Sequence, residues 1–213
     1  MSLGTSRRSR PAVRPPMSLH ISPETNGVLL SAREFDNADF EEGWRYELIH
    51  GVLVVTPIPL ENEVDPNEEL GYLLRYYKDT HPQGSALDVT LFERTVRTGQ
   101  NRRRADRLIW TGLGRLPRRY ETPSIIVEFV SADRRNWLRD YVTKRDEYLA
   151  IGVHEYWVID RFRHTLTVFR VQRGKVKKRV FTKEQTYKTD LLPGFELPLA
   201  RLFLLADRWP SDE

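Results

Sequence analysis

Short apolar and alternating runs recur along the chain and predict the strands of a sheet. The first two runs, residues 46–49 and 52–55, flank His50 and Gly51, and a glycine in a two-residue connection supplies the positive φ that a tight hairpin requires. Further runs have the length and composition of strands, and they cover residues 86–92, 105–110, 124–130, 156–160, 165–171 and 176–181. The run at 124–130 is apolar on both faces apart from Glu128, which predicts a central strand covered on both sides.

Helical patterns separate these runs. Ser31 precedes Glu34 by three residues, a capping-box spacing that predicts a short helix through about residue 39. Apolar side chains recur at helical spacing in residues 67–78 and 134–151, and Gly152 supplies a stop for the second helix. The segment that begins at residue 191 and ends near residue 203 is expected to be looped. This order of elements predicts an α+β or mixed α/β domain rather than a regular βαβ repeat.

The length and the ends of the chain predict a single domain. The 213 residues, 39% of them hydrophobic, can bury one substantial core and are few for two independent domains. Residues 1–24 are rich in Ser, Pro and Arg and lack apolar periodicity, so we expect a disordered basic tail there. The domain should then cover residues 25–206, followed by a short C-terminal tail at 207–213.

The composition excludes several classes of protein. No apolar run approaches the ~18 residues of a membrane helix, and no hydrophobic stretch follows the N-terminal arginines as it would in a secretory signal. The chain has no cysteine, which excludes disulfides, thiolate metal ligands and a cysteine nucleophile. Any metal must therefore bind through oxygen or imidazole, and a cytoplasmic location is expected.

The charge distribution is more informative than the net charge of +4. Four arginines in residues 1–16 account for the excess, so the rest of the chain is neutral. Within it, residues 94–119 hold nine arginines and Asp106 as the one acid, and residues 170–188 hold eight Lys or Arg and one Glu. Two interpretations stay open, namely basic surfaces that attract a polyanion and ordinary solvated hairpin faces.

A carboxylate inside an apolar strand needs a partner, and Glu128 is such a carboxylate. A salt bridge to a buried arginine, or a place at the solvated end of the strand, would satisfy it. Asp106 lies in a neighbouring predicted strand, and two acids held close together repel unless a hard cation such as Mg²⁺ binds between them. The pair therefore suggests a metal site.

The predicted helix that follows adds a cation to this pattern. Asp140, Lys144 and Tyr148 are spaced i, i+4, i+8 and share one helix face. If that face meets the sheet, Lys144 can orient an attacking water or stabilise charge that develops on a phosphate. The alternative is an ordinary surface pair between Asp140 and Lys144.

These residues lie within an ordered series of motifs. The series is residues 45–51 (RYELIHG), 104–106 (RAD), 126–131 (IVEFVS), Lys144 with Tyr148, 152–160 (GVHEYWVID) and 191–195 (LLPGF). In this order they resemble the Uma-two family of restriction-type endonucleases, over about residues 28 to 205. That family belongs to the PD-(D/E)XK nuclease superfamily, so the resemblance implies a restriction-endonuclease-like core with a mixed central sheet flanked by helices.

The resemblance also implies roles for the site residues. Asp106 and Glu128 would bind Mg²⁺ or Mn²⁺, Lys144 would take the lysine role of the superfamily, and Glu47 would be a supplementary acid. Two further residues match supporting positions of the family, Asp140 and Tyr148. The expected activity is hydrolysis of DNA phosphodiester bonds, and a homodimer is an expectation taken from the superfamily.

Flanking phosphates of the DNA are expected to contact four arginines of the basic segment, Arg102, Arg103, Arg104 and Arg107. The competing hypothesis is a catalytically inactive nuclease-fold domain that acts in nucleic-acid binding or protein interaction.

The chain departs from the family pattern in four places. Ala105 replaces the proline that usually precedes the aspartate, and Val130 stands where the superfamily has a strand lysine. Residues 131–133 read Ser-Ala-Asp in place of Ser-Pro-Ser, and the region of Pro66 replaces a histidine. The metal ligands are retained, and catalysis depends on whether Lys144 reaches them.

Overall fold

A mixed eight-stranded sheet forms the centre of the computed structural model, which describes residues 18–130 and 139–210 apart from the side chains of residues 139 and 140. The strands are β3 (Trp44–Ile49), β4 (Val52–Pro57), β5 (Leu87–Thr98), β6 (Asn101–Thr111), β7 (Ile125–Phe129), β8 (Glu155–Asp160), β9 (Thr165–Gln172) and β10 (Lys175–Thr182). They run in the order β10, β9, β8, β7, β6, β3, β4, and β5 pairs with β6. Strands β7 and β8 are parallel, and the other described neighbours in this sheet are antiparallel.

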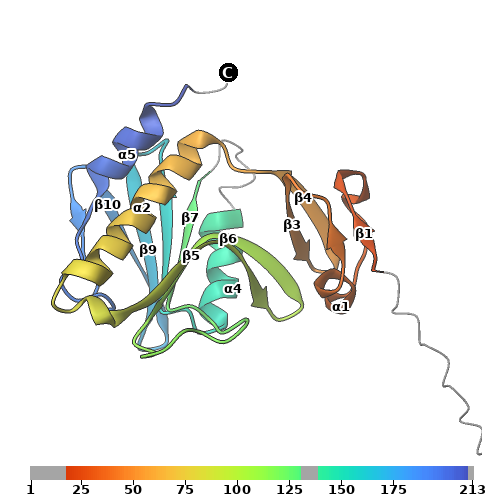
Figure 1. Ribbon diagram of the computed structural model, residues 1–213, viewed down its shortest axis with the longest axis horizontal. Coiled ribbons are helices and arrows are strands. Elements are labelled where there is room, and N and C mark those ends of the chain that lie inside the picture. The colour runs from red at the N-terminus through yellow and green to blue at the C-terminus, as the bar shows by residue number, and fades with distance from the viewer. Residues whose placement is uncertain (1–17, 131–138, 211–213) are drawn as a thin grey trace, which may run out of the picture.

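Two helices cover one face of the sheet (Figure 1). Helix α2 (Glu61–Thr80) packs beside α5 (Leu199–Asp207), and their apolar residues Leu70 and Leu202 join Val127 of β7 in one buried cluster. Consecutive residues of a strand point to opposite faces. The two helices therefore bury the side chains on one face of β7, and the side chains on its other face need a second cover.

Helix α4 (Arg145–Ala150) provides that second cover. It follows a π-helical turn, Arg139–Lys144. Its Tyr148 packs edge-on against Tyr156 of β8, with ring centroids 5.3 Å apart, in a cluster that includes Ile126 of β7. Strand β7 is thus buried along its whole length, as its run of apolar residues predicted.

A small N-terminal unit packs on the β3–β4 hairpin and lies at the far end of the β5–β6 arms (Figure 1). It contains β1 (His20–Ile21), η1 (Pro23–Thr25), α1 (Ala32–Asp36) and β2 (Asp39–Phe40). Ile21 is buried there and pairs with Phe40. Residues 20–24, which were expected to belong to a disordered tail over residues 1–24, therefore lie in β1 and η1 of this unit.

Local signals in the sequence set α1 and the first hairpin as predicted. Ser31 Oγ accepts a hydrogen bond from the Glu34 amide at 3.2 Å, and Glu34 Oε2 accepts one from the Ser31 amide at 2.8 Å. In the β3–β4 turn, His50 and Gly51 have φ values of 51° and 81°. Both values are positive, as a type I′ hairpin turn requires.

The sequence runs predicted a strand that ends at residue 92 and a loop after it, and this prediction was wrong. Strands β5 and β6 form one long hairpin that turns at Gly99. Residues 93–104 lack apolar alternation, and this is why the pattern indicated a loop. Charged side chains of this segment are buried in ion pairs instead. Arg102 and Arg103 are as buried as apolar residues of the core, and each pairs with a carboxylate.

Helix boundaries also differ from the expectation. Helix α2 begins at Glu61, ahead of Pro66, and the buried residues Asn62, Pro66 and Asn67 show that packing holds this first part in place. The C-terminal segment ends in helix α5 rather than a loop. Its buried residues Leu199 and Phe203 stand at i and i+4, a spacing that does predict a helix.

The helix expected over 134–151 is described from residue 139 onward, and the part before it lies outside the described residues. The helix ends before Gly152, whose φ is 92°, as predicted. A third, two-stranded sheet joins β11 (Thr186–Tyr187) to β12 (Leu197–Pro198), and η2 (Gly84–Ala86) precedes β5. Among the helices of the described residues, none has the length and apolar character needed to cross a membrane.

Candidate active site

The candidate site lies where strand β6 changes its neighbour. Leu48 of β3 pairs with Arg102 of β6, whereas Val127 of β7 pairs with Arg107 of the same strand. Between these two positions β3 and β7 diverge, and the backbone of β6 lacks a regular strand partner on that side. Carboxylates fill this fork in the sheet.

Asp106 and Glu47 each accept a hydrogen bond from backbone in the fork. Asp106 Oδ2 accepts from the Phe129 amide at 2.7 Å, and Glu47 Oε1 accepts from the Arg104 amide at 2.8 Å. In a continuous sheet these two amides would donate to carbonyl groups of a neighbouring strand. Here the two carboxylates accept those hydrogen bonds instead. The need for backbone partners at the fork explains why buried acids occur here.

Asp106 and Glu128 stand at the end of the paired segment that β6 and β7 share. Arg107 and Val127 are the last paired residues of β6 and β7, and Asp106 and Glu128 are the next residue on each strand. Asp106 Oδ2 also accepts from the amide of Phe129, the residue that follows Glu128. The sheet register therefore brings the two predicted metal ligands together.

Asp106 is buried and ionised. Burial alone would raise the pKa of this carboxyl, but the positive charges of Arg45 and Lys144 and the Phe129 amide outweigh it and lower the pKa below its usual value. Arg45 Nη2 donates directly to Asp106 Oδ1. Burial disfavours the charged form of Arg45, yet its acidic neighbours Asp106 and Glu93 raise its pKa above the ordinary value.

Glu128 accepts from two residues of the helix that covers β7. Lys144 Nζ lies 2.9 Å from Glu128 Oε2, and the Tyr148 hydroxyl donates to Glu128 Oε1 at 2.9 Å. Burial first, and then the charge of Glu128, raise the pKa of Tyr148 well above its usual value, so Tyr148 remains a donor. Lys144 and Tyr148, spaced i, i+4, both contact the sheet, which is one of the two alternatives that the sequence left open.

Two residues of the cluster carried no predicted role. Glu93 Oε1 lies 3.1 Å from Arg45 Nη2, and Glu93 Oε2 lies 3.2 Å from Arg104 Nε. Arg45 could have been found, because it stands two residues before Glu47 and so shares its strand face. Glu93 lay in the segment expected to be a loop, and its φ of 43° marks a strained position of the kind found at functional sites.

Three of the four arginines expected to contact phosphates are buried in ion pairs or hydrogen bonds, and for them the prediction was wrong. Arg102 binds Asp36 through two nitrogens at 2.7 and 2.8 Å. Arg103 binds Glu147 in the same way at 2.7 and 2.5 Å. Both guanidinium groups already have a carboxylate partner, so they hold elements of the fold together.

Arg107 is the third buried arginine. It donates to Asn67 Oδ1 and to the Asn67 carbonyl, each at 2.6 Å, and burial lowers its pKa to about 10. Its contacts tie α2 to β6. Arg104 differs, because its side chain is one third exposed and it lies between the acidic cluster and solvent. Asp140 lies in the π-helical turn, and its side chain is outside the described residues.

The chemistry of the donor set fits a hard divalent cation. Within the described residues no group of three or more His, Asp or Glu side chains is arranged as a ready metal cage. Mg²⁺ rarely uses such a cage, since it keeps several waters and binds one or two carboxylates together with substrate phosphate. Asp106 and Glu128 can supply those two carboxylates, because each oxygen has a second lone pair beyond the hydrogen bond it accepts.

Comparisons with known proteins support the family and the fold. The family model of Uma2, described as "Putative restriction endonuclease", matches residues 32–200. The crystal structure of "a putative nuclease belonging to DUF820" from Anabaena variabilis superimposes with a TM-score of 0.67 at 19% identity, over 83% of this chain and 99% of that one. At that identity the likeness shows the fold, and it confirms the predicted mixed sheet flanked by helices. No curated protein matches the chain.

Proposed function

Because the chain belongs to the Uma2 family of restriction-type endonucleases, we propose that it is a divalent-metal-dependent endonuclease that hydrolyses phosphodiester bonds of DNA. The observation that carries the proposal is the convergence of Asp106, Glu128 and Lys144 from three separate elements. A buried lysine bound to one of two facing carboxylates is an arrangement that a stable core does not require, because such groups lose much hydration energy on burial.

Asp106 and Glu128 would hold the ion, Mg²⁺ or Mn²⁺. When bound between carboxylates, such an ion polarises a phosphate oxygen and lowers the pKa of a water ligand. Asp106 is suited to this role because the lowered pKa of its carboxyl keeps it ionised at neutral pH. Glu47 would serve as a supplementary acid from the neighbouring strand.

Lys144 would stabilise the charge that develops beside the ion, and Tyr148 would orient a ligand of that ion. The Lys144 ammonium, fixed on Glu128, places positive charge where negative charge develops on the attacked phosphate. Tyr148 holds the other oxygen of Glu128 and so sets the orientation of that carboxylate. Lys144 is proposed as a catalytic residue, and Tyr148 as a positioning residue.

A second candidate function has an observation in its favour. Arg45 already binds Asp106 and Glu93, so an internal cation neutralises part of the acidic cluster. A nuclease-fold domain stabilised in this way could bind nucleic acid without cutting it. Cleavage experiments distinguish the two functions.

The test is cleavage of supercoiled plasmid, single-stranded and branched DNA in the presence of Mg²⁺, Mn²⁺ or EDTA. We expect cleavage with either ion and none with EDTA. Asp106→Asn should abolish cleavage, since the amide still accepts from Phe129 but no longer offers a charged ligand. Asp146→Asn is the matched control, because Asp146 is exposed on α4 and pairs with its neighbour Arg145. Cleavage that survives Asp106→Asn, or that persists in EDTA, would overturn the proposal.

A further inference from the structure

A pocket of about 490 Å³ opens beside the candidate active site, between the β5–β6 hairpin and the loop of residues 112–123. Its floor contains the apolar side chains of Leu91, Leu108, Trp110 and Ile151. Its rim is basic, with five arginines, Arg94, Arg97, Arg104, Arg118 and Arg119. A hollow with an apolar floor and a cationic rim fits a ligand that combines a flat apolar group with negative charge.

Three of these arginines are available to an anion. Arg94, Arg118 and Arg119 are exposed, and among the described residues none of them forms an ion pair with a carboxylate. Arg97 and Arg104 are held by Asp36 and Glu93. Of the five arginines, the three exposed ones are therefore those that an anion can reach without breaking an ion pair.

Tyr120 provides an aromatic surface at the same rim. Its side chain is exposed, and the guanidinium groups of Arg97 and Arg119 lie 3.4 and 4.8 Å from the centre of its ring. The φ of Tyr120 is 64°, in the left-handed region that disfavours a side chain with a Cβ. The loop holds the ring at the pocket in spite of this strain.

The pocket and the catalytic cluster are joined by shared residues. Glu93 and Arg104 line the pocket, and Glu93 also binds Arg45, which in turn binds Asp106. Glu93 and Arg104 therefore connect the pocket to the acidic cluster through ion pairs.

We propose that this pocket binds one unpaired nucleotide next to the scissile phosphate, so that the substrate class is DNA with a single-stranded region. The inference rests on the proposed function, which supplies the scissile phosphate. In a duplex the bases are stacked and paired, and a base reaches a hollow only after it leaves the stack. An unpaired nucleotide can place its base on the apolar floor or against Tyr120 and its phosphates on Arg118 and Arg119, which is how single-stranded nucleic acid is generally bound.

The test measures binding of fluorescent oligonucleotides by polarisation in EDTA, where no cleavage interferes. Wild-type protein should bind a single strand about 10-fold more tightly than the corresponding blunt duplex, because stacking on an aromatic group favours unpaired bases. The double variant Arg118→Ala/Arg119→Ala should weaken single-strand binding at least about 10-fold and lower the salt slope by about 1.4, as expected for two lost phosphate contacts. Tyr120→Ala should weaken it about 5-fold, and Tyr120→Phe should restore it.

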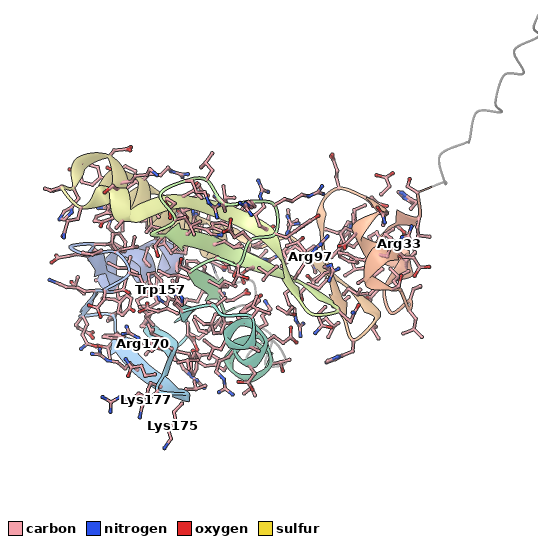
Figure 2. All side chains as sticks on the ribbon, turned by 90° about the horizontal axis from the view of Figure 1, so that it is seen from below. Arg33, Arg97, Trp157, Arg170, Lys175 and Lys177 are labelled. Atoms are coloured by element: carbon pink, nitrogen blue, oxygen red, sulfur yellow. The ribbon has the colours of Figure 1, made fainter. Side chains whose placement is uncertain are left out.

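Lys175→Ala/Lys177→Ala is the matched control. It removes the same charge from β10, where Figure 2 shows both lysines at an edge of the molecule away from Arg97. Equal or tighter binding of the duplex, or an equal loss in this control, would overturn the inference. All variants change exposed residues and should melt at the wild-type temperature.

The two proposals fail in different ways. Single-strand preference that depends on Arg118, Arg119 and Tyr120, without any cleavage, would support the pocket and refute the nuclease function. Metal-dependent cleavage of blunt duplex that is unaffected by these substitutions would support the nuclease function and refute the pocket.

Discussion

Lys144 Nζ lies 2.9 Å from Glu128 Oε2, and each of the two side chains is 3% exposed. The superfamily that the sequence resembles has a lysine on the strand two residues after the glutamate, where this chain has Val130. The lysine that meets the glutamate here comes from the helix that covers the strand. A buried pair of this kind affects both stability and chemistry, and the two effects can be separated.

We expect Lys144→Met to lower the free energy of unfolding by about 3 kcal/mol, because the buried Glu128 carboxylate loses its ammonium partner. Urea unfolding at pH 7 measures the change. The double variant Lys144→Met/Glu128→Gln should recover a large part of the loss, since the buried charge is then removed as well. A single variant as stable as the wild type would show that the pair is not buried as described.

Tyr148→Phe should reduce DNA cleavage about 10-fold at saturating DNA while leaving DNA binding in EDTA unchanged, because it frees one oxygen of Glu128 without removing a charge. It should also lower the free energy of unfolding by about 1.5–3 kcal/mol, the value of a hydrogen bond to a charged group. Single-turnover cleavage and calorimetry measure the two effects. A weaker affinity for DNA with unchanged cleavage at saturation would contradict a positioning role.

The acid stability of the protein should depend on Asp106. The pKa of Asp106 is lowered in the folded state, so its contribution to stability is complete above the unfolded pKa of about 3.9 and is lost as the pH falls through the lower folded value. Urea unfolding from pH 7 to pH 3 should therefore show a steeper loss for the wild type than for Asp106→Asn. Parallel curves would mean that Arg45 and Lys144 do not stabilise the ionised form.

Arg107 should matter for folding rather than for DNA. Its side chain is 1% exposed and donates to Asn67 on α2, so Arg107→Ala should lower the free energy of unfolding by about 2–4 kcal/mol through lost hydrogen bonds and lost packing. Gly71→Ala tests the same contact from the helix side, because a Cβ at Gly71 would lie 2.7 Å from Arg107 Nη1. It should destabilise by about 1–3 kcal/mol.

DNA affinity distinguishes Arg107 from the exposed arginines. For folded Arg107→Ala protein, binding of oligonucleotides in EDTA should equal that of the wild type, whereas Arg118→Ala/Arg119→Ala should bind more weakly at unchanged stability. If Arg107→Ala lost as much DNA affinity as Arg118→Ala/Arg119→Ala, Arg107 would contact phosphate, as the sequence first predicted.

Features that depend on neighbouring residues can be predicted from the sequence alone. The capping box of Ser31 and Glu34, the turn at His50 and Gly51 and the apolar strand around Glu128 are local, since backbone geometry and side-chain periodicity specify them within a few residues. The spacing of Lys144 and Tyr148 is local in the same sense. These patterns predicted the mixed fold, and together with the resemblance to the Uma-two family they predicted the residues of the candidate site.

The distribution of charge between core and surface depends on contacts between distant segments of the chain. The arginine-rich segment 94–119 has one composition along its length, yet Arg103 is buried against Glu147 while Arg118 and Arg119 stay exposed at the pocket. Pairing with a carboxylate from a distant segment offsets the cost of burying a guanidinium. The periodicity of the sequence does not identify that carboxylate. The fork of β6, and with it the place of Glu93 and Arg45 beside Asp106, depends in the same way on strands that meet only in the folded chain.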